Sequence, residues 1–255
     1  MYKNRKVVCV IPARLASSRL PRKMLAEING KPLIQWVWEA AMRVKLFDEV
    51  IISPDTDELY SVVKGFGAQA LMTSERCENG TERLIELQKR GLVQADVWVN
   101  WQGDEPFVTA SMIKDLLQTC DDEEIWTLRK KIADPTSPHI AKVVCDTQGY
   151  ALYFSRSAIP YYRESSVEKI YYKHIGLYAY ASSMLKKIST LPFSPLEKAE
   201  KLEQLRYLEG GLKVRVHETQ SEVFGIDTPE QLASARLHLG ASSGMIDGDD
   251  NARIS

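Results

Sequence analysis

Short apolar runs alternate with segments of helical periodicity through the first hundred residues, and this alternation limits the possible folds more than any other feature. The run 7–11 is apolar throughout, which is typical of a strand that helices cover on both faces. Further strands are predicted at 49–53, 70–73 and 96–100, and helices at 33–44, 57–66 and 81–90. Because strand and helix alternate repeatedly, we expect an α/β fold with a mostly parallel central sheet.

The second half of the chain has a different pattern. Strands are predicted at 141–145, 151–155, 176–180 and 214–217, with few helices between them. One helix is predicted to start at Ser194, with Glu197 completing a capping box, and to end at Gly210. A last helix is predicted to start at Thr228 by the same logic and to run to about His238.

These patterns predict one domain over residues 1–239. We expect its central sheet to be mostly parallel and to be joined to a smaller mixed-sheet part. The tail 240–255 is small, polar and acidic, so we expect it to be disordered.

Charge balance and cysteine spacing exclude several classes of protein. The chain has 33 Lys and Arg against 34 Asp and Glu, a net charge of −1, whereas nucleic-acid binding over a whole surface needs a strongly basic balance. No run approaches the ~20 apolar residues of a membrane helix, and the apolar run that follows the basic N-terminus is too short for a signal peptide. The four cysteines are far apart and form no CxxC pair. We therefore expect a reduced, cytoplasmic protein with no nucleic-acid or membrane partner.

A loop with four cations follows the first predicted strand. Arg14, Arg19, Arg22 and Lys23 lie within ten residues. Ligands of open parallel sheets bind at the carboxyl ends of the strands, and Arg and Lys are the usual partners of phosphate groups. The loop has neither the GxGxxG pattern nor a P-loop ending. Local phosphate binding is one interpretation, and a solvated basic turn is the other.

Two aspartates occupy comparable places farther along the chain. Asp104 follows the strand 96–100, where Mg²⁺ could bridge it to a substrate phosphate, but Gly-Asp before a proline is also a common turn. Asp227 precedes the last helix and could simply cap it. The two aspartates would form a site only if they converge on one metal ion, which their spacing in the sequence cannot show.

Four other polar residues give weaker signals. Arg83 is predicted in the first turn of a helix, where a cation is unfavourable for the helix dipole, and this hints at a ligand anion. His174 enters a predicted strand, where the pattern favours a histidine with a structural role. Glu203 and Gln204 flank the apolar stripe of their helix and could be solvated.

Taken in order, these segments resemble the sugar-activating cytidylyltransferases, and most closely the 3-deoxy-manno-octulosonate (Kdo) cytidylyltransferase family. The resemblance extends from about Val7 to about Leu239. The motifs that carry it are Ile11-Pro12-Ala13-Arg14, Ser17, Arg19-Leu20-Pro21, Lys23, Asn29-Gly30-Lys31-Pro32-Leu33-Ile34, Met72-Thr73, Gly80-Thr81-Glu82-Arg83, Gln102-Gly103-Asp104-Glu105-Pro106, Ala151-Leu152-Tyr153-Phe154-Ser155-Arg156, Ile159-Pro160, His174-Ile175-Gly176-Leu177-Tyr178, Leu202-Glu203-Gln204-Leu205-Arg206 and Asp227-Thr228-Pro229-Glu230.

The resemblance implies a fold and an activity. The fold would be the three-layer α/β/α sandwich of the nucleotide-diphospho-sugar transferases, with the smaller mixed-sheet part forming a homodimer. The activity would be transfer of CMP from CTP to the anomeric hydroxyl of Kdo, an eight-carbon acidic sugar, with release of pyrophosphate. The enzyme would use Mg²⁺ and work in the cytoplasm, and its product would serve lipopolysaccharide synthesis.

The resemblance also implies roles for single residues. Catalysis is expected from Arg19, Lys23, Asp104 and Asp227, with Asp104 and Asp227 as the Mg²⁺ ligands. Nucleotide binding is expected from Ala13, Arg14, Ser17, Arg19, Lys23 and Thr73. Sugar recognition is expected from Arg83, Gln102, Arg156, His174, Tyr178, Glu203 and Gln204.

Four positions depart from the family pattern and leave alternatives open. Arg22 stands where a small residue, often Gly, is usual, Cys77 and Asn79 stand where His and Ser are frequent, and Trp101 replaces a smaller apolar residue. One alternative is a cytidylyltransferase for another sugar acid, such as 8-amino-Kdo or a sialic acid, although the segment 153–206 argues against the sialic acid. The other alternative is a non-catalytic nucleotide-binding regulator of the same fold.

Overall fold

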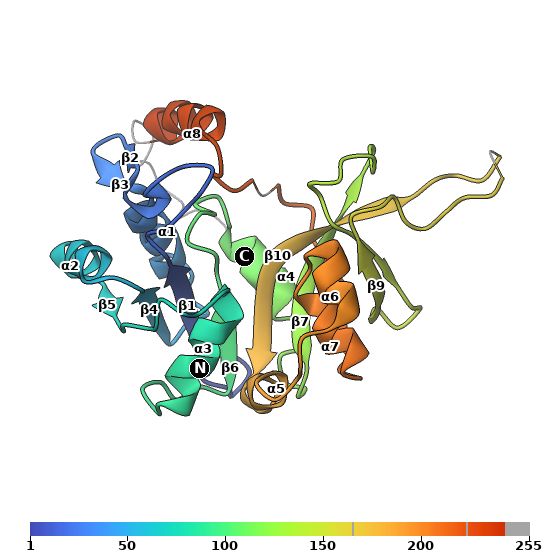
Figure 1. Cartoon of the computed structure of the whole chain (residues 1–255), viewed down its shortest axis with the longest axis horizontal. Helices are drawn as coiled ribbons and strands as arrows, with labels where there is room; N and C mark the ends of the chain where they lie inside the picture. The colour runs from blue at the N-terminus through green and yellow to red at the C-terminus, as the bar shows by residue number, and fades with distance from the viewer. Residues whose placement is uncertain (165, 223, 243–255) are drawn as a thin grey trace, which may run out of the picture.

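One nine-stranded sheet organises the protein, in the order β11-β7-β10-β6-β1-β4-β5, with β8 and β9 attached through β10 (Figure 1). This computed structural model describes residues 1–164, 166–222 and 224–242, with side chains up to residue 239. The parallel strands at one end of the sheet are β1 (Val7–Ala13), β4 (Glu49–Pro54), β5 (Gln69–Ala70) and β6 (Val97–Asn100). All four were predicted, although β5 is only two residues long.

Helices cover both faces of this sheet because β1 is apolar on both sides. Val7, Cys9 and Ile11 pack into one buried cluster, and Val8 and Val10 pack into another on the opposite face. The first cluster contains residues of α1 (Leu33–Met42), α2 (Asp57–Gly65) and α4 (Ala110–Leu116), and the second contains residues of α3 (Gly80–Lys89) and α5 (Ser182–Ile188). The predicted three-layer α/β/α sandwich is therefore confirmed.

A second group of strands continues the sheet with mixed directions, as predicted. It contains β7 (Ile125–Ile132), β8 (Lys142–Cys145), β9 (Ala151–Ser155), β10 (Tyr171–Ala181) and β11 (Val214–Glu218). β10 is antiparallel to β6 at one end and to β8 at the other, so this long, curved strand joins the two parts of the sheet (Figure 1). A register shift between Ile175 and Tyr178 interrupts its pairing with β7.

The sequence did not predict β7, α4 or α5. The second half of β7 carries Arg129, Lys130 and Lys131. Two of these cations find partners that are distant in the sequence, since Arg129 pairs with Glu218 and Lys130 with Glu222. A charged strand of this kind has no clear apolar period, and α4 and α5 have only seven residues each.

The prediction of one continuous helix from Ser194 to Gly210 is wrong, because the structure has two helices there. They are α6 (Pro195–Glu200) and α7 (Gln204–Glu209), separated by Lys201 in the left-handed conformation with φ 54°. The predicted capping box of Ser194 and Glu197 is confirmed. The break follows from Arg156, whose guanidinium donates to the carbonyl oxygens of Glu200 at 2.6 Å and Lys201 at 3.3 Å. Those carbonyls would otherwise have accepted helical hydrogen bonds.

The last helix, α8 (Pro229–Ser242), starts after Thr228 as predicted. It continues four residues beyond the expected end near His238. The rest of the expected disordered tail, 243–255, lies outside the described residues, so the domain boundary at residue 239 stays a prediction.

Within the described part of the chain, no helix combines the length and apolarity that crossing a membrane requires. The remaining short elements are η1 (Lys23–Leu25), β2 (Glu27–Ile28) and β3 (Lys31–Pro32).

Candidate active site

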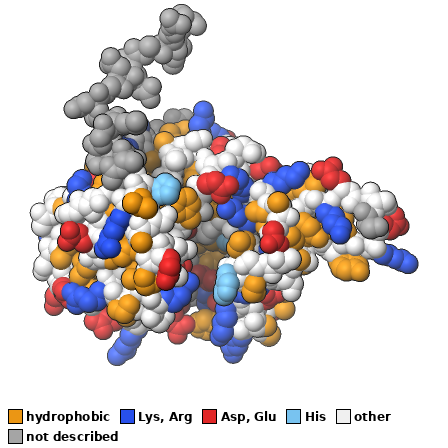
Figure 2. Space-filling model, turned by 90° about the horizontal axis from the view of Figure 1, so that it is seen from above, with side chains coloured by type: hydrophobic (Ala, Val, Ile, Leu, Met, Phe, Trp, Pro, Cys, Tyr) orange, Lys and Arg blue, Asp and Glu red, His pale blue; other side chains and the backbone are white. Residues whose placement is uncertain are grey.

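The carboxyl ends of β1 and β6 meet at one edge of the sheet, because the two strands pair in parallel with Val10 opposite Asn100. The basic loop follows β1 and the turn that contains Asp104 follows β6, so the two segments face one another. A cavity of about 330 Å³ lies between them. Figure 2, which views the molecule from above, shows this face hollowed between two parts of the molecule. One part carries α1 and α2, and the other is the projecting arm, which carries β8 and β9.

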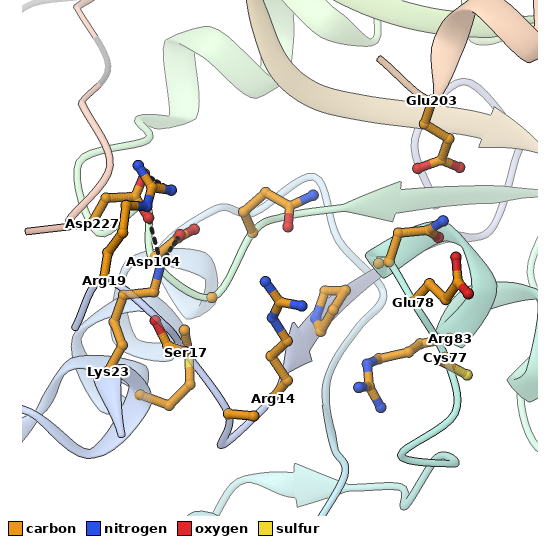
Figure 3. A pocket seen from close by; sticks show the side chains of 17 residues that line it. Arg14, Ser17, Arg19, Lys23, Cys77, Glu78, Arg83, Asp104, Glu203 and Asp227 are labelled. Atoms are coloured by element: carbon orange, nitrogen blue, oxygen red, sulfur yellow. Dashed lines mark hydrogen bonds and ion pairs between the residues drawn. The ribbon is translucent and has the colours of Figure 1, made fainter. Parts of the chain in front are cut away.

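The cavity contains nine of the fifteen site residues that the sequence analysis predicted. It is lined by Arg14, Ser17, Arg19, Lys23, Arg83, Gln102, Asp104, Glu203 and Asp227, together with Pro12, Ala16, Met24, Cys77, Glu78, Asn79, Gly80 and Gly103. Figure 3 shows Arg19, Lys23, Asp104 and Asp227 gathered at one end, and Glu203 and Glu78 at the other end.

A buried lysine joins the two predicted metal ligands. The ammonium Nζ of Lys23 lies 2.5 Å from Oδ2 of Asp104 and 2.7 Å from Oδ1 of Asp227 (Figure 3). Arg19 approaches the other oxygen of Asp227 at 2.9 Å. Lys23 is only 8% exposed, whereas the side chain of Arg19 is 65% exposed. Arg19 and Lys23 of the basic loop therefore form one cluster with two aspartates that are far from the loop in the sequence. This cluster lies at the cavity wall.

Backbone contacts explain why Asp104 and Asp227 converge. The amide of Trp101 donates to the carbonyl of Val10, and its indole nitrogen donates to the carbonyl of Glu105 at 3.0 Å, which fixes the turn after β6. The amide of Ile226 donates to the carbonyl of Asp104 at 2.9 Å. This hydrogen bond places the residue next to Ile226, which is Asp227, beside Asp104.

Asp227 is not the cap of α8, which was the alternative interpretation of its position. The hydroxyl of Thr228 accepts from the amide of Gln231 at 3.3 Å. The side-chain oxygen of Gln231 in turn accepts from the amides of Asp227 and Thr228. The carboxylate of Asp227 is consequently available to the cations of the cavity.

Asp104 and Asp227 also suit a divalent cation. Their carboxylates already converge on one positively charged atom, and carboxylate oxygens are the ligands that Mg²⁺ prefers. The described residues contain no group of three or more His, Cys, Asp or Glu side chains placed to hold a metal ion. A cation bound by these two aspartates would need oxygens from a substrate or from water to complete its coordination.

Glu105, which the sequence analysis assigned no role, is a partly buried neighbour of this cluster. Its Oε2 is shielded from solvent and has no hydrogen-bond partner among the described residues. Burial, followed by the neighbouring charges of Asp104 and Asp227, raises its pKa to about 8. At neutral pH Glu105 is therefore mostly protonated, so the negative charge of this cluster comes from Asp104 and Asp227.

Arg83 lies at the cavity but is already paired. Its guanidinium donates to the hydroxyl of Thr73 at 2.8 Å and contacts Asp55 at 3.3 Å. Asp55 also accepts from the amide of Leu15, so it links Arg83 to the basic loop. The sequence position of Arg83 indicated a bound anion, and the protein itself supplies one in the carboxylate of Asp55.

Six of the predicted residues do not line the cavity, namely Ala13, Thr73, Arg156, His174, Tyr178 and Gln204. Nε2 of His174 lies 3.0 Å from the hydroxyl of Thr127, and burial lowers the pKa of its imidazole to about 3. The hydroxyl of Tyr178 and the amide nitrogen of Gln204 are buried without a hydrogen-bond partner among the described residues. Such groups call for a ligand or water.

Three of the four departures from the family pattern have structural roles. Asn79 caps α3 by accepting from the amide of Glu82 at 2.9 Å. Arg22 has φ 56°, a conformation that favours glycine, and its guanidinium pairs with Glu58 outside this cavity. Trp101 is fully buried and fixes the turn that carries Asp104.

The fourth departure, Cys77, faces the cavity. Its thiol donates to Glu86 at 3.3 Å, and burial together with this carboxylate raises its pKa to about 11. Cys77 is therefore a thiol rather than a thiolate at neutral pH. Two further lining residues, Glu78 and Gly103, had no assigned role, and only the fold identifies them.

Gly103 permits the close approach of the turn to β1, which gives a prediction. A Cβ at this position would lie 2.7 Å from the backbone oxygen of Pro12 and 2.9 Å from the sulfur of Met24. Gly103→Ala should therefore destabilise the protein by roughly 1–3 kcal/mol and lower its melting temperature by several degrees. Gly65→Ala is the control, because nothing lies within 4 Å of the added methyl group. Thermal unfolding of both variants tests this, and a wild-type melting temperature for Gly103→Ala would contradict it.

Comparisons with known proteins agree with this geometry. The family model described as cytidylyltransferase matches residues 8–214. The 3-deoxy-manno-octulosonate cytidylyltransferase of Geobacter sulfurreducens is 42% identical over 242 residues, covering 89% of this chain and 96% of that protein. The protein of the same name from Thermodesulfovibrio yellowstonii is 44% identical over 252 residues, covering 92% of this chain and 99% of the relative.

Solved structures give the same result. The structure of CMP:2-keto-3-deoxy-manno-octonic acid synthetase complexed with CTP has a TM-score of 0.88 and 41% sequence identity, and the match covers 93% of this chain and 99% of that one. An inositol-1-phosphate CTP transferase from T. maritima, at 14% identity and a TM-score of 0.66, shares the fold alone. The chain belongs to the cytidylyltransferase family and, within it, to the 3-deoxy-manno-octulosonate cytidylyltransferases.

Proposed function

We propose that this protein transfers the CMP group of CTP to the anomeric hydroxyl of Kdo and releases pyrophosphate. The observation that carries the proposal is the cluster of Arg19, Lys23, Asp104 and Asp227 at one end of the cavity. Such a cluster combines the cations that bind phosphates with the carboxylates that bind a metal ion. The relatives that match nearly the whole chain carry the name of this activity.

The reaction follows from the charges at the cavity. The anomeric oxygen forms a bond to the α-phosphorus, the bond from that phosphorus to the β-phosphate oxygen breaks, and the hydroxyl proton is released to solvent. Lys23 and Arg19 would neutralise the negative charge that develops on the leaving pyrophosphate. Asp104 and Asp227 would hold Mg²⁺. The bound ion would supply Lewis acidity at the phosphate oxygens.

The other predicted contacts form two groups, one for the nucleotide and one for the sugar. Arg14 and Ser17 line the cavity beside the triphosphate site that we propose, whereas Ala13 and Thr73 are buried and do not line it. On the sugar side, Arg83, Gln102 and Glu203 line the cavity. The proposal for Tyr178 and Gln204 is supported by their buried polar atoms, which have no hydrogen-bond partner among the described residues. The proposal for His174 is supported by its ring, whose centroid lies 5.4 Å from that of Tyr178.

Arg156 has the least structural support as a sugar contact. Its guanidinium is occupied by the carbonyl oxygens of Glu200, Lys201 and Pro138. This arrangement gives it a role in shaping the α6–α7 break, and sugar binding by Arg156 stays a prediction from the resemblance.

We further propose that the protein is a homodimer that acts in the cytoplasm and supplies lipopolysaccharide synthesis. Among the described strands, β9 pairs only with β8, and Leu152 on β9 is 62% exposed. Tyr161, which follows β9 in the projecting arm, is 88% exposed. The four free cysteines are compatible with a reducing compartment. Sedimentation at micromolar concentration should give the mass of two chains, and a single monomeric species would contradict the dimer.

Pyrophosphate release tests the proposed function directly. With purified protein and Mg²⁺, we expect release only when CTP and Kdo are both present, and little with UTP, ATP or GTP. The 8-amino analogue and a sialic acid serve as alternative acceptors, since a pocket built to hydrogen-bond one group strongly rejects its analogue. Release with a different acid would change the substrate, and no release with any pair would contradict the enzyme assignment.

Asp104→Asn tests the metal site. The amide keeps the shape of the side chain and removes the charge that pairs with Lys23. Turnover with CTP, Kdo and Mg²⁺ should fall at least about 100-fold, because metal stabilisation of the developing charge amounts to several kcal/mol. The exposed Asp122→Asn is the matched control and should keep wild-type turnover. Circular dichroism should show both variants folded, and near-normal turnover by Asp104→Asn would remove this residue from the catalytic set.

A further inference from the structure

Three hydroxyl groups form a chain that ends on Glu203, at the far end of the cavity from Lys23 (Figure 3). The hydroxyl of Tyr207 donates to Oε1 of Glu203 at 2.5 Å. The hydroxyl of Thr81 lies 3.4 Å from the hydroxyl of Tyr207, and the hydroxyl of Tyr180 lies 3.1 Å from that of Thr81. The chain connects α7, α3 and β10, which are distant in the sequence.

Burial separates the members of this chain into two groups. Tyr180 and Tyr207 are each 1% exposed and Thr81 is 2% exposed, so a ligand in the cavity cannot contact them unless the structure opens. The side chain of Glu203 retains 24% exposure and lines the cavity. Glu203 is therefore the one member of the chain that a ligand can reach directly.

The direction of the hydrogen bonds follows from the chemistry of the groups. An ionised carboxylate can only accept, so Tyr207 must donate its proton to Glu203. The hydroxyl of Tyr207 faces both Glu203 at 2.5 Å and the oxygen of Thr81 at 3.4 Å, and the shorter bond to the carboxylate is the stronger. Thr81 and Tyr180 lie 3.1 Å apart, and either hydroxyl can donate to the other. These contacts hold the hydroxyl of Tyr207 beside the carboxylate.

The fold provides little else to fix the Glu203 side chain. It sits immediately before the first residue of α7, where it makes no capping hydrogen bond. Nη2 of Arg206 is 3.7 Å away, too far for a strong charged contact. Tyr207 lies four residues later on the same helical face, which places its hydroxyl against the carboxylate.

Burial opposes the ionised form of Glu203 and raises its pKa above the usual range. The hydroxyls of Tyr207 and Thr81 and the charge of Arg206 act in the other direction, while Glu197 adds to the increase. The ionised carboxylate therefore depends on hydrogen bonds from behind the cavity wall.

We propose that Tyr207 is a positioning residue for recognition of the acceptor sugar. Its hydroxyl, supported by Thr81 and Tyr180, holds the carboxylate of Glu203 toward the cavity, where that carboxylate accepts hydrogen bonds from hydroxyl groups of a polyhydroxylated acid. The inference rests on the proposed function, because it assigns Glu203 to the acceptor rather than to the nucleotide. The distance of Glu203 from the Lys23 cluster supports that assignment (Figure 3).

Tyr207→Phe removes the hydroxyl and keeps the ring. We expect the KM for Kdo to rise about tenfold, which corresponds to ~1.4 kcal/mol, while kcat and the KM for CTP change less than twofold. Tyr150→Phe is the matched control, because Tyr150 also donates to a glutamate, Glu124, but does not line the cavity. Equal changes in both KM values for Tyr207→Phe would show a general structural effect and overturn the proposal.

A double-mutant cycle with Glu203→Gln gives the sharper test. If Tyr207 acts only through Glu203, adding Tyr207→Phe to Glu203→Gln should change the KM for Kdo less than twofold. Independent effects that multiply in the double variant would overturn the proposal. Turnover of the wild-type protein with CTP and Kdo tests the proposed function. The ratios of the KM values for Kdo between variants test the role of Tyr207.

Thr81 keeps the proposal testable if Tyr207→Phe does not fold. Thr81→Val removes the second hydroxyl with nearly the same shape, and Thr81→Ser retains a hydroxyl. We expect Thr81→Val to raise the KM for Kdo severalfold and Thr81→Ser to stay near the wild-type value. Identical KM values for the two variants would show that the hydroxyl is dispensable and would overturn the proposal.

Discussion

The parallel pairing of β1 with β4 on one side and β6 on the other is the constraint on which the rest of the structure depends. Because the strands are parallel, their carboxyl ends lie at one edge, and the loops that follow them face each other. β1 can take this central place because it is apolar on both faces and helices cover both. The basic loop and the turn with Asp104 meet for this reason, and the hydrogen bonds of Trp101 then fix the turn.

Electrostatics then determines what this edge can bind. The carboxylates of Asp104 and Asp227 share the ammonium of Lys23, and Arg19 and Glu105 surround them. Without a cation between them, the two carboxylates would repel each other in a site partly withdrawn from water. A cation between them relieves that repulsion, and the same charges suit a metal ion and a triphosphate. The site is therefore matched to the transfer of a nucleotidyl group.

The mixed part of the sheet supplies the other end of the cavity. β10 extends from the parallel strands into the arm, and Arg156 breaks the helix that follows into α6 and α7. After this break, Glu203 is the residue that precedes α7, and its side chain lines the cavity. Buried hydroxyls from three elements then hold its carboxylate. The acceptor recognition that we propose thus depends on contacts between residues that are 99 and 126 positions apart in the sequence.

The sequence by itself determined the α/β class, the strands of the parallel part, the helix starts at Ser194 and Thr228, and the set of motifs that resemble one family. These features are local, because apolar periodicity and capping act within a few residues. It could not predict β7, whose charged half is stabilised by distant carboxylates, or the break at Lys201. Nor could it show whether Asp104 and Asp227 converge, or that Arg83 pairs with Asp55. Only the tertiary structure decided these points, since each depends on a contact between residues that sequence spacing does not relate.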